Sequence, residues 1–420
     1  MARILAYTSP SRGDLYPIVP VLTELRGRGH QVMVRTLSSA VPMLRELGFE
    51  AAPVAAEIEA IAHDDYRAHN PNAAIKRSLR VFARRAPFEQ ADLSAALEQE
   101  FPDAVLVDFN CWGAAAVAEQ AGVAWGRWCS YPLPLPSSEA PPFGPGLPPA
   151  HGRLGRMRDR VLSPIVTGGF ERIILPQVNE VRAAQGLDRL TGIADIVTAA
   201  PVLLSMTAEP FEYPRSDWPP SVRLIGPCTW EPPAPPPSWL AEVDRPLVLV
   251  TTSSEFQDDG VLVRVALEAL ADEPVQVVAT VPAGTGTFAV PDNARVATDL
   301  PHAAILRHAA CAVTHGGMGA TQKALAHGVP VCVVPFGRDQ HEVARRVQHA
   351  GAGVRLGKRA LRGRNAARAF RDAVTATMVR TDGARAIANA FERAGNGSAG
   401  ADAVEEVLLS SRPDGQAGRS

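Results

Sequence analysis

Apolar segments of strand length alternate with longer segments of helical periodicity along most of the chain. Near the N-terminus "RILAYT" is followed by the helical pattern "YPIVPVLTELRGRG" and then by "QVMVRT", and "DAVLVDF" is followed by "CWGAAAVAEQAG". Strands that are apolar at nearly every position are typical of a parallel sheet covered by helices on both faces. After residue 245 the same alternation begins again with "RPLVLVTT" and "GVLVRVALEALAD". The pattern therefore predicts an α/β protein with two doubly wound units in succession.

Two proline-rich segments interrupt this alternation. Residues 226–240, "GPCTWEPPAPPPSWL", cannot form regular backbone hydrogen bonds and favour an extended chain, which predicts a linker between the units. Residues 131–152 lie inside the first unit and are predicted to form a long surface loop of the kind that shapes a ligand pocket. The first unit is predicted to span 1–225 and the second 241–385, and residues 411–420 are predicted to be a frayed tail.

The composition limits the classes of function. The 420 residues, 46% of them apolar and 20% charged, are enough to bury the cores of two domains. The 42 Lys and Arg residues nearly balance the 44 Asp and Glu residues, so no basic field favours nucleic acid or an anionic membrane. The N-terminus lacks the apolar core of a signal peptide, and no apolar run reaches the roughly 18 residues of a membrane helix. We therefore expect a cytoplasmic protein without stable membrane insertion.

The segment 313–353 carries the most specific chemical signal. Its first strand ends in His315, Gly316 and Gly317, and a helix is predicted to begin at Gly319. Glycines at such a turn let the backbone approach a ligand closely, and the free N–H groups and the helix dipole favour a phosphate or diphosphate. The glycines alone fit an ordinary turn between a strand and a helix equally well.

The order "HGGMGAT", "AL", "GVP", "VVP", "DQ" and "ARRV" in this segment resembles the nucleotide-sugar motif of family 1 glycosyltransferases. The resemblance implies the GT-B fold, in which two Rossmann-like domains face each other across a cleft, and the branch that glycosylates macrolides, polyketides and antibiotics. The N-terminal domain would bind the acceptor and the C-terminal domain the nucleotide sugar. A C-terminal helix within 386–410 would pack back on the N-terminal domain.

The resemblance assigns donor contacts residue by residue. The groups implied to hold the donor diphosphate are His315, Gly317, the backbone of Ala320 and Thr321, and the Thr321 hydroxyl. Asp339 and Gln340 would bind the hydroxyls of the donor sugar. Such polar residues are also common in turns and helix caps, which is the alternative for each of them.

Two further segments resemble donor-binding loops of the family. In "TSSEFQ", Ser253 and Ser254 are candidate contacts of a phosphate or of the donor's linker. In "DLPHAAIL", Pro301 and His302 would lie beside the nucleobase. For the two serines a role in the turn is an equally good interpretation.

Lys323 departs from the family pattern. In many relatives a Glu stands eight residues after the motif His and binds the ribose, whereas this chain has Lys323. An ammonium donates hydrogen bonds but cannot accept them from two ribose hydroxyls. The departure favours a dTDP-linked donor, which has no 2′-hydroxyl, over a UDP-linked donor. The alternative is a surface lysine on the outer face of its helix.

Asp14 is the candidate catalytic base. In many relatives the loop after the first strand reads Gly-His-x-x-Pro, and the His deprotonates the acceptor hydroxyl; here "GDLYP" places Asp14 at that position. The sequence "SRGD" resembles the vancomycin-type and sterol glucosyltransferase branches, which carry an Asp there. A carboxylate can accept the proton if burial raises its pKa from about 3.9 toward neutrality. The alternative is that Asp14 caps a helix.

Asp108, at the end of "AVLVDF", matches the position that orients the base in relatives with a His. A second carboxylate close to Asp14 would raise one pKa by repulsion. Capping of the following helix near Cys111 is an equally good interpretation of Asp108. The reaction implied is an inverting displacement at the anomeric carbon. It would need no metal or other cofactor, since no Asp-x-Asp pair stands where a metal would bind.

The acceptor is expected in an apolar cleft of the N-terminal domain. The candidate lining residues are Trp112, Trp128, Tyr131 and Phe143. Core packing is the alternative for each of these aromatic residues. Two helical stretches, "GRLGRMRDRVL" and "QVNEVRAAQ", are expected to frame the cleft. With an Asp base and an aromatic acceptor, transfer of the sugar to carbon (C-glycosylation) stays open beside transfer to oxygen.

The rival functions share the fold or the donor site. A nucleotide-sugar epimerase would need no acceptor cleft, and a non-catalytic helper that binds a sugar nucleotide for a partner transferase would not need Asp14. A dehydrogenase is disfavoured because no G-x-G-x-x-G follows the first strand. The expected partners are a nucleotide-sugar donor and a small apolar aglycone, with no nucleic acid and with a homodimer as one option.

Overall fold

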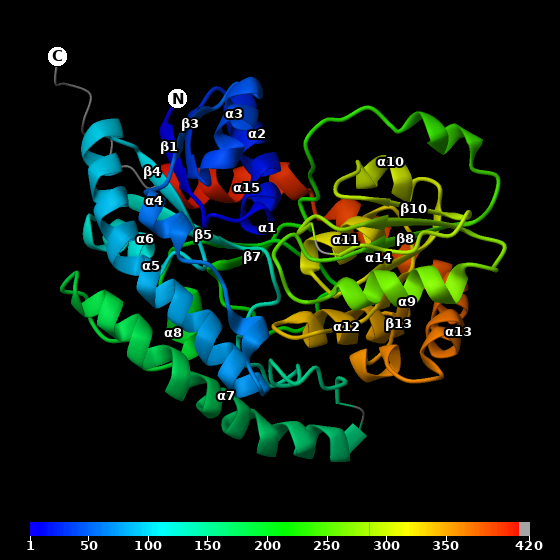
Figure 1. Ribbon diagram of the computed structural model, residues 1–420. Helices are drawn as coiled ribbons and strands as arrows, with labels where there is room; N and C mark the ends of the chain where they lie inside the picture. The colour runs from blue at the N-terminus through cyan, green and yellow to red at the C-terminus, as the bar shows by residue number, and fades with distance from the viewer. Residues whose placement is uncertain (151, 285, 411–420) are drawn as a thin grey trace.

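The protein consists of two α/β domains that lie side by side, each built on its own sheet (Figure 1). The computed structural model describes residues 1–150, 152–284 and 286–410. Every strand pairing in both sheets is parallel. The predicted fold, two doubly wound units in succession, is confirmed.

The N-terminal sheet has seven strands. Their order across the sheet is β3 (Glu50–Pro53), β2 (Gln31–Thr36), β1 (Arg3–Tyr7), β4 (Ala104–Asp108), β5 (Ala124–Cys129), β6 (Leu203–Ser205) and β7 (Val222–Leu224). Its helices are α1 (Arg12–Leu15), α2 (Val19–Gly27), α3 (Val41–Glu46), α4 (Ala56–Ala60), α5 (Pro71–Glu100), α6 (Trp112–Gln120), α7 (Gly152–Ala183) and α8 (Ile193–Thr198). The central strands β1 and β4 are almost entirely buried, because helices cover both of their faces.

The C-terminal sheet has six strands. Their order is β10 (Ala294–Ala297), β9 (Gln276–Thr280), β8 (Leu247–Thr251), β11 (Ala309–Thr314), β12 (Val331–Val333) and β13 (Gly353–Arg355). Its helices are α9 (Gly260–Leu270), α10 (His302–Leu306), α11 (Met318–Ala326), α12 (Gln340–His349), α13 (Ala366–Met378) and α14 (Thr381–Arg393). One apolar core joins α11, α12 and α14 to one face of the sheet, and a second joins α9 and α13 to the other.

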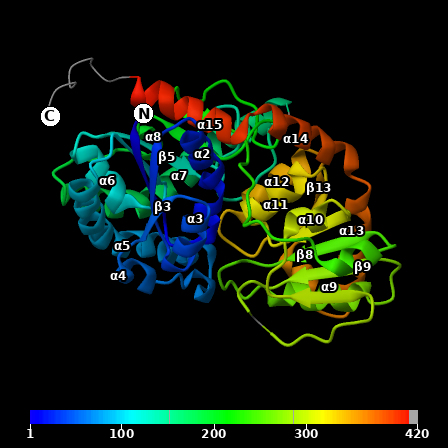
Figure 2. The same cartoon turned by 90° about the horizontal axis from the view of Figure 1, so that it is seen from above.

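The end of the described chain returns to the N-terminal domain. Helix α14 still packs on α11, and the chain then crosses over so that α15 (Asn396–Val404) lies against α2 (Figure 2). Two glycines make this contact close, because a Cβ at Gly397 would lie 2.7 Å from the Pro20 carbonyl oxygen and one at Gly400 2.6 Å from a Val21 methyl group. Arg28 of the N-terminal domain pairs with Asp402 at 2.6 Å.

Residues 226–240 form no strand and only begin a short 3₁₀-helix (Ser238–Glu242), in agreement with their high proline content. The predicted tail, 411–420, lies outside the described residues. None of the helices in the described part of the chain has the length and apolar character needed to cross a membrane.

A buried ion network joins the domains. The guanidinium of Arg346 on α12 contacts Glu212 of the N-terminal domain at 2.7 Å and Glu342 on its own helix at 2.8 Å. Glu342 also accepts hydrogen bonds of 2.8 Å from the backbone N–H groups of Gly144 and Gly146. The proline-rich loop that the sequence predicted to lie on the surface is therefore attached to the C-terminal domain.

Replacing Arg346 by Ala would leave Glu212 and Glu342 buried without their cation. Because removing one partner of a buried ion pair is costly, we expect the free energy of unfolding to fall by about 3–5 kcal/mol in urea unfolding experiments. Arg368→Ala, an exposed arginine on α13, is the matched control and should change stability little. Equal stability of the two variants would contradict this role of Arg346.

Candidate active site

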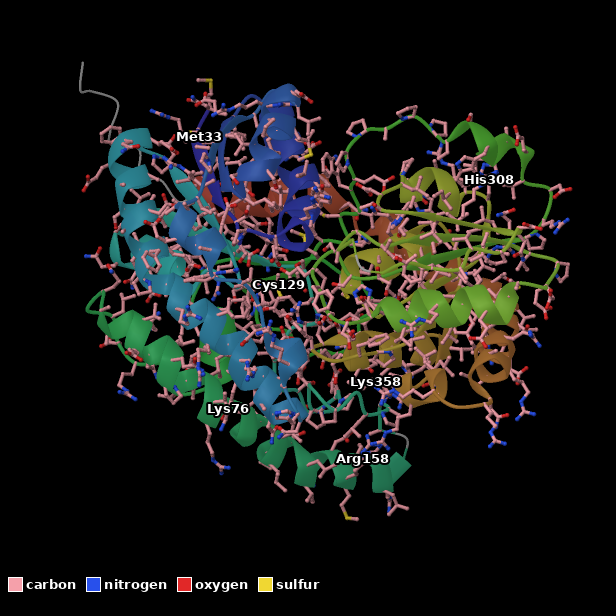
Figure 3. The ribbon with its side chains drawn as sticks, viewed as in Figure 1. Met33, Lys76, Cys129, Arg158, His308 and Lys358 are labelled. Atoms are coloured by element: carbon pink, nitrogen blue, oxygen red, sulfur yellow. The ribbon has the colours of Figure 1, made fainter. Side chains whose placement is uncertain are left out.

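A cleft of about 1920 Å³ lies between the domains and is lined by both. In each sheet the order of strands changes direction beside the first strand, between β1 and β4 and between β8 and β11. Open parallel sheets bind ligands outside the carboxyl ends of their strands at such points. The loops after β1, β4 and β5 contribute one wall of the cleft, and the loops after β8 and β11 contribute another. Figure 3 labels Cys129, which ends β5, and Lys358, which lines the cleft from the C-terminal domain.

Asp14 lies in α1 and lines the cleft, but it does not cap the helix. The cap is Ser11, whose hydroxyl accepts a 3.1 Å hydrogen bond from the Gly13 N–H. The Asp14 carboxylate instead accepts hydrogen bonds from the Asn110 amide at 3.4 Å and the Ser130 hydroxyl at 3.3 Å. The capping alternative for Asp14 is therefore wrong.

The surroundings of Asp14 raise the pKa of its carboxyl to about 6. Burial is the largest cause, because it disfavours the charged form, and the negative charge of Glu255 from the C-terminal domain adds to it. Hydrogen bonds from Ser11 and Ser130 and the positive charge of Arg85 act in the opposite direction. The carboxyl is therefore ionised at neutral pH but much more basic than an exposed aspartate.

Asp108, at the end of β4, is buried and accepts a 2.7 Å hydrogen bond from the backbone N–H of Asn110. This contact closes the turn before α6, but the N-cap of α6 is Cys111 and no side chain caps it, so the capping interpretation of Asp108 is wrong. Burial, followed by repulsion from Asp14, raises the pKa of Asp108 well above its ordinary value. The side chain thus supports the turn and also interacts with Asp14 electrostatically.

Asn110 links Asp14 to Tyr131 on the same wall of the cleft. Its amide oxygen accepts a 2.8 Å hydrogen bond from the Tyr131 hydroxyl, while its amide nitrogen donates to Asp14. Sequence reasoning singled out neither Asn110 nor Ser130 as a partner of Asp14. They directly follow β4, which is next to β1, and β5, which is next to β4, and these places are the signal that could have identified them.

The first turn of α11 faces the cleft from the C-terminal domain. Gly316 has a φ of 96°, and a Cβ there would lie 2.9 Å from the Gln340 side chain, so a glycine is required. The ring of His315 lies against Gly317, where a Cβ would come within 2.5 Å of its Nε2 atom. Burial lowers the pKa of His315 to about 4, so the imidazole is neutral at pH 7. Its Nδ1 atom is buried and has no hydrogen-bond partner among the described residues.

Thr321 does not reach the cleft. Its side chain is fully buried, and its hydroxyl lies 3.0 Å from the Thr314 hydroxyl in the core between α11 and β11. Its backbone N–H donates to the Gly317 carbonyl. The implied contact of Thr321 with a diphosphate therefore does not fit this structure, whereas Gly319 and Ala320 do line the cleft.

Asp339 and Gln340 lie at the start of α12 and both line the cleft. Burial raises the pKa of Asp339 to about 6. Gln340 is almost fully buried, and its amide oxygen accepts hydrogen bonds from the backbone N–H groups of Phe336 at 2.7 Å and Gly337 at 3.0 Å. Its amide nitrogen donates to Gln257 at 2.6 Å. Gln340 thus holds two loops together at the edge of the site.

The two predicted serines differ in their surroundings. Ser253 is buried, and its hydroxyl accepts a 2.8 Å hydrogen bond from Gln257, which supports the interpretation as a turn residue. Its backbone N–H donates to Asp259 at 2.7 Å. Ser254 is exposed on the wall of the cleft. Ser254 is therefore the better placed of the two for contact with a ligand.

Pro301 and His302 line the cleft at the start of α10. His302 forms a 3.0 Å hydrogen bond with the Thr280 hydroxyl, and burial lowers its pKa to about 4. Lys323 does not lie on an outer helix face, contrary to the alternative interpretation. It lines the cleft near His302 and pairs with Glu231 of the linker at 2.7 Å.

Arg338 joins the two walls of the cleft. It contacts Asp65 of the N-terminal domain at 2.8 Å and Glu255 of its own domain at 2.9 Å. Within the described ranges, no group of three or more His, Cys, Asp or Glu side chains could hold a metal ion.

Aromatic side chains of the N-terminal domain line part of the cleft. Trp112, Tyr131 and Phe143 line it as predicted, but Trp128 does not. Trp128 is fully buried in the core, and its indole N–H donates to the backbone carbonyl of Asp14 at 3.2 Å, so it supports the loop.

The two helical stretches expected to frame the cleft belong to one helix, α7. Its middle part, rather than its ends, lines the cleft opposite α5. The larger apolar side chains that line the cleft are, from α5, Ile75, Leu79 and Phe82 and, from α7, Ile165, Val166, Phe170, Ile173 and Ile174.

Known proteins match both the sequence and the fold. Residues 264–395 match the family model described as Erythromycin biosynthesis protein CIII-like, C-terminal domain. The chain is 36% identical over 401 residues to 4′-demethylrebeccamycin synthase of Lentzea aerocolonigenes. The alignment covers 91% of this chain and 94% of that protein.

Two solved structures have the same architecture. The Streptomyces sp. SF2575 glycosyltransferase SsfS6, complexed with thymidine diphosphate, matches with a TM-score of 0.70 at 18% sequence identity. The match covers 97% of this chain and 100% of that chain. The spinosyn rhamnosyltransferase SpnG, complexed with spinosyn aglycone, has a TM-score of 0.73 at 17% identity and covers 96% of this chain and 100% of its own. The chain therefore belongs to the GT-B glycosyltransferases of natural-product biosynthesis.

Proposed function

We propose that the protein transfers a sugar, with inversion, from a nucleoside-diphosphate donor to a hydroxyl of a small apolar natural product. One observation carries the proposal: a single cleft holds a carboxyl with a raised pKa on one wall and the glycine-rich start of α11 on the other. A base and a site for an anionic leaving group on opposite walls are what a single displacement at the anomeric carbon needs.

Asp14 is the general base of the proposed reaction. It removes the proton from the acceptor hydroxyl as the oxygen attacks the sugar. Asn110 and Ser130 orient its carboxylate, and Glu255 and burial keep it basic enough to accept the proton near neutral pH. Asp108 acts through the turn that holds Asn110.

The nucleoside diphosphate leaves toward α11. The backbone N–H groups at the start of this helix and its dipole stabilise the negative charge that develops on the diphosphate. His315 contributes as a neutral hydrogen-bond donor rather than as a cation, because its pKa is about 4. Asp339 binds hydroxyls of the donor sugar, and no metal or other cofactor takes part.

A dTDP-linked sugar is the favoured donor, and a UDP-linked sugar is the second choice. Residue 323 is a lysine, which cannot accept hydrogen bonds from the two hydroxyls of a ribose. The related fold that carries thymidine diphosphate supports this choice. The acceptor is a polycyclic or macrocyclic aglycone, because α5 and α7 provide an extended apolar wall beside Asp14.

Asp14→Asn should lower kcat by about 10²- to 10⁴-fold, because the amide cannot take the proton. Binding of dTDP, measured by isothermal titration calorimetry, should not change. Asp64→Asn, outside the residues that line the cleft, is the matched control. Full turnover by Asp14→Asn would contradict the assignment of the base and favour the non-catalytic helper.

The pH dependence of kcat/KM tests the same residue. A base must be ionised to act, so a carboxyl with a pKa of about 6 predicts activity above pH 6 and a loss of about tenfold per pH unit below it. The measurement is the initial rate at saturating donor and low acceptor concentration, from about pH 4.5 to about pH 8.5. An acid limb near the ordinary pKa of an aspartate would show that burial does not tune Asp14.

Ligand-induced stabilisation tests the donor. At about a hundred times its Kd, a nucleotide should add about 2.7 kcal/mol to the free energy of unfolding and raise the melting temperature. We expect a larger shift with dTDP than with UDP, and none with NAD. A shift with NAD alone would overturn the proposed function.

The absence of a metal requirement has its own test. Transfer activity should be the same in excess EDTA as in excess Mg²⁺, because backbone N–H groups and the helix dipole act on the diphosphate. Loss of activity in EDTA that Mg²⁺ restores would show that the reaction needs a metal.

A further inference from the structure

The linker between the domains contributes two neighbouring side chains to the cleft. Trp230 packs edge-to-face on Tyr16 of the N-terminal domain, with ring centroids 5.1 Å apart. Glu231 contacts the C-terminal domain, where its carboxylate accepts 2.7 Å and 2.8 Å hydrogen bonds from the Lys323 ammonium and the Ala303 N–H. Both residues line the cleft. The aromatic contact and the ion pair hold this part of the linker at a defined place.

We propose that Glu231 is a donor-binding residue whose carboxylate accepts a hydrogen bond from a hydroxyl of the donor's pentose. The inference rests on the proposed function, because it needs a nucleoside diphosphate in the cleft. Lys323 cannot accept a hydrogen bond from a pentose hydroxyl, because an ammonium only donates. The inference assigns this acceptor role to the carboxylate of Glu231 in the linker.

The position of the pair supports this assignment. A diphosphate at the first turn of α11 and a nucleobase beside His302 leave the pentose between them. Lys323 lies about one helical turn beyond Gly319, and its partner Glu231 also faces the cleft there. The other carboxyl near His302, Asp299, is exposed and has no comparable support from a cation.

The ionised carboxylate of Glu231 can accept a further hydrogen bond. Burial of the side chain opposes ionisation, but the charge of Lys323 and the hydrogen bonds from Lys323 and Ala303 outweigh it and hold the pKa of Glu231 below its ordinary value. A carboxylate has about four lone-pair sites, and the two recorded partners use two of them. Glu231 can therefore accept from a pentose hydroxyl while its ion pair stays intact.

The test compares affinities for dTDP, UDP and inorganic pyrophosphate by isothermal titration calorimetry. Glu231→Gln should weaken binding of both nucleotides by about tenfold, because a hydrogen bond to a charged group is lost. Binding of pyrophosphate, which has no pentose, should not change. Glu242→Gln, at an exposed glutamate that ends the 3₁₀-helix begun by the linker, is the matched control and should behave as the unmodified protein.

A charge exchange separates hydroxyl recognition from loss of the ion pair. Glu231→Lys and Lys323→Glu should each weaken nucleotide binding, and the double variant should recover most of it, because a carboxylate again faces the pentose. Unchanged nucleotide affinity in Glu231→Gln, or an equal loss for pyrophosphate, would overturn the inference while leaving the proposed function intact. Failure of the unmodified protein to bind either nucleotide would overturn both.

In steady-state kinetics, Glu231→Gln should raise the KM for the donor and leave kcat nearly unchanged, since the pentose does not take part in the displacement. A fall in kcat with an unchanged KM would contradict a binding role.

Discussion

The buried guanidinium of Arg346 sets the relation between the two domains. It lies between Glu212 of one domain and Glu342 of the other, and Glu342 in turn holds the backbone of the proline-rich loop. A buried charge that loses its partner is strongly unfavourable, so these groups keep each other in place. The network therefore connects the two domains beside the cleft, and the loop becomes part of the cleft wall instead of lying free in solvent.

That arrangement explains how an aspartate can serve as the proposed base. Asp14 lies in a short helix at the first strand, and its pKa depends on groups that come from other elements. Asn110 and Ser130 follow neighbouring strands, whereas Glu255 belongs to the other domain. The proposed chemistry is thus coupled to the closed arrangement of the domains, because moving the C-terminal domain away would remove the charge of Glu255 and expose Asp14 to water.

Linker residues 230 and 231 add a further connection between the walls. Their side chains contact opposite domains: Trp230 packs on Tyr16, two residues after the proposed base, and Glu231 pairs with Lys323 beside the proposed nucleoside site. A lysine in place of the family's glutamate predicts a weaker ribose site when only the sequence is considered. In the proposed arrangement Glu231, which is far away in the chain, supplies an acceptor for one pentose hydroxyl, and a deoxyribose needs no second acceptor.

The sequence by itself determined the α/β class, the two parallel sheets and the glycine-rich turn at residues 315–317, because periodicity and turn chemistry are local properties. It also brought Asp14 and Asp339 to the cleft, since loops after parallel strands meet at one edge. Only the tertiary structure decided which of the predicted side chains face the cleft: Thr321 in α11 and Trp128 in β5 point into the core because their helix and strand faces pack there. It alone also decided the partners of Lys323 and Arg338, because ion pairs across 92 and 273 residues of chain depend on how the domains close and leave no trace in local patterns.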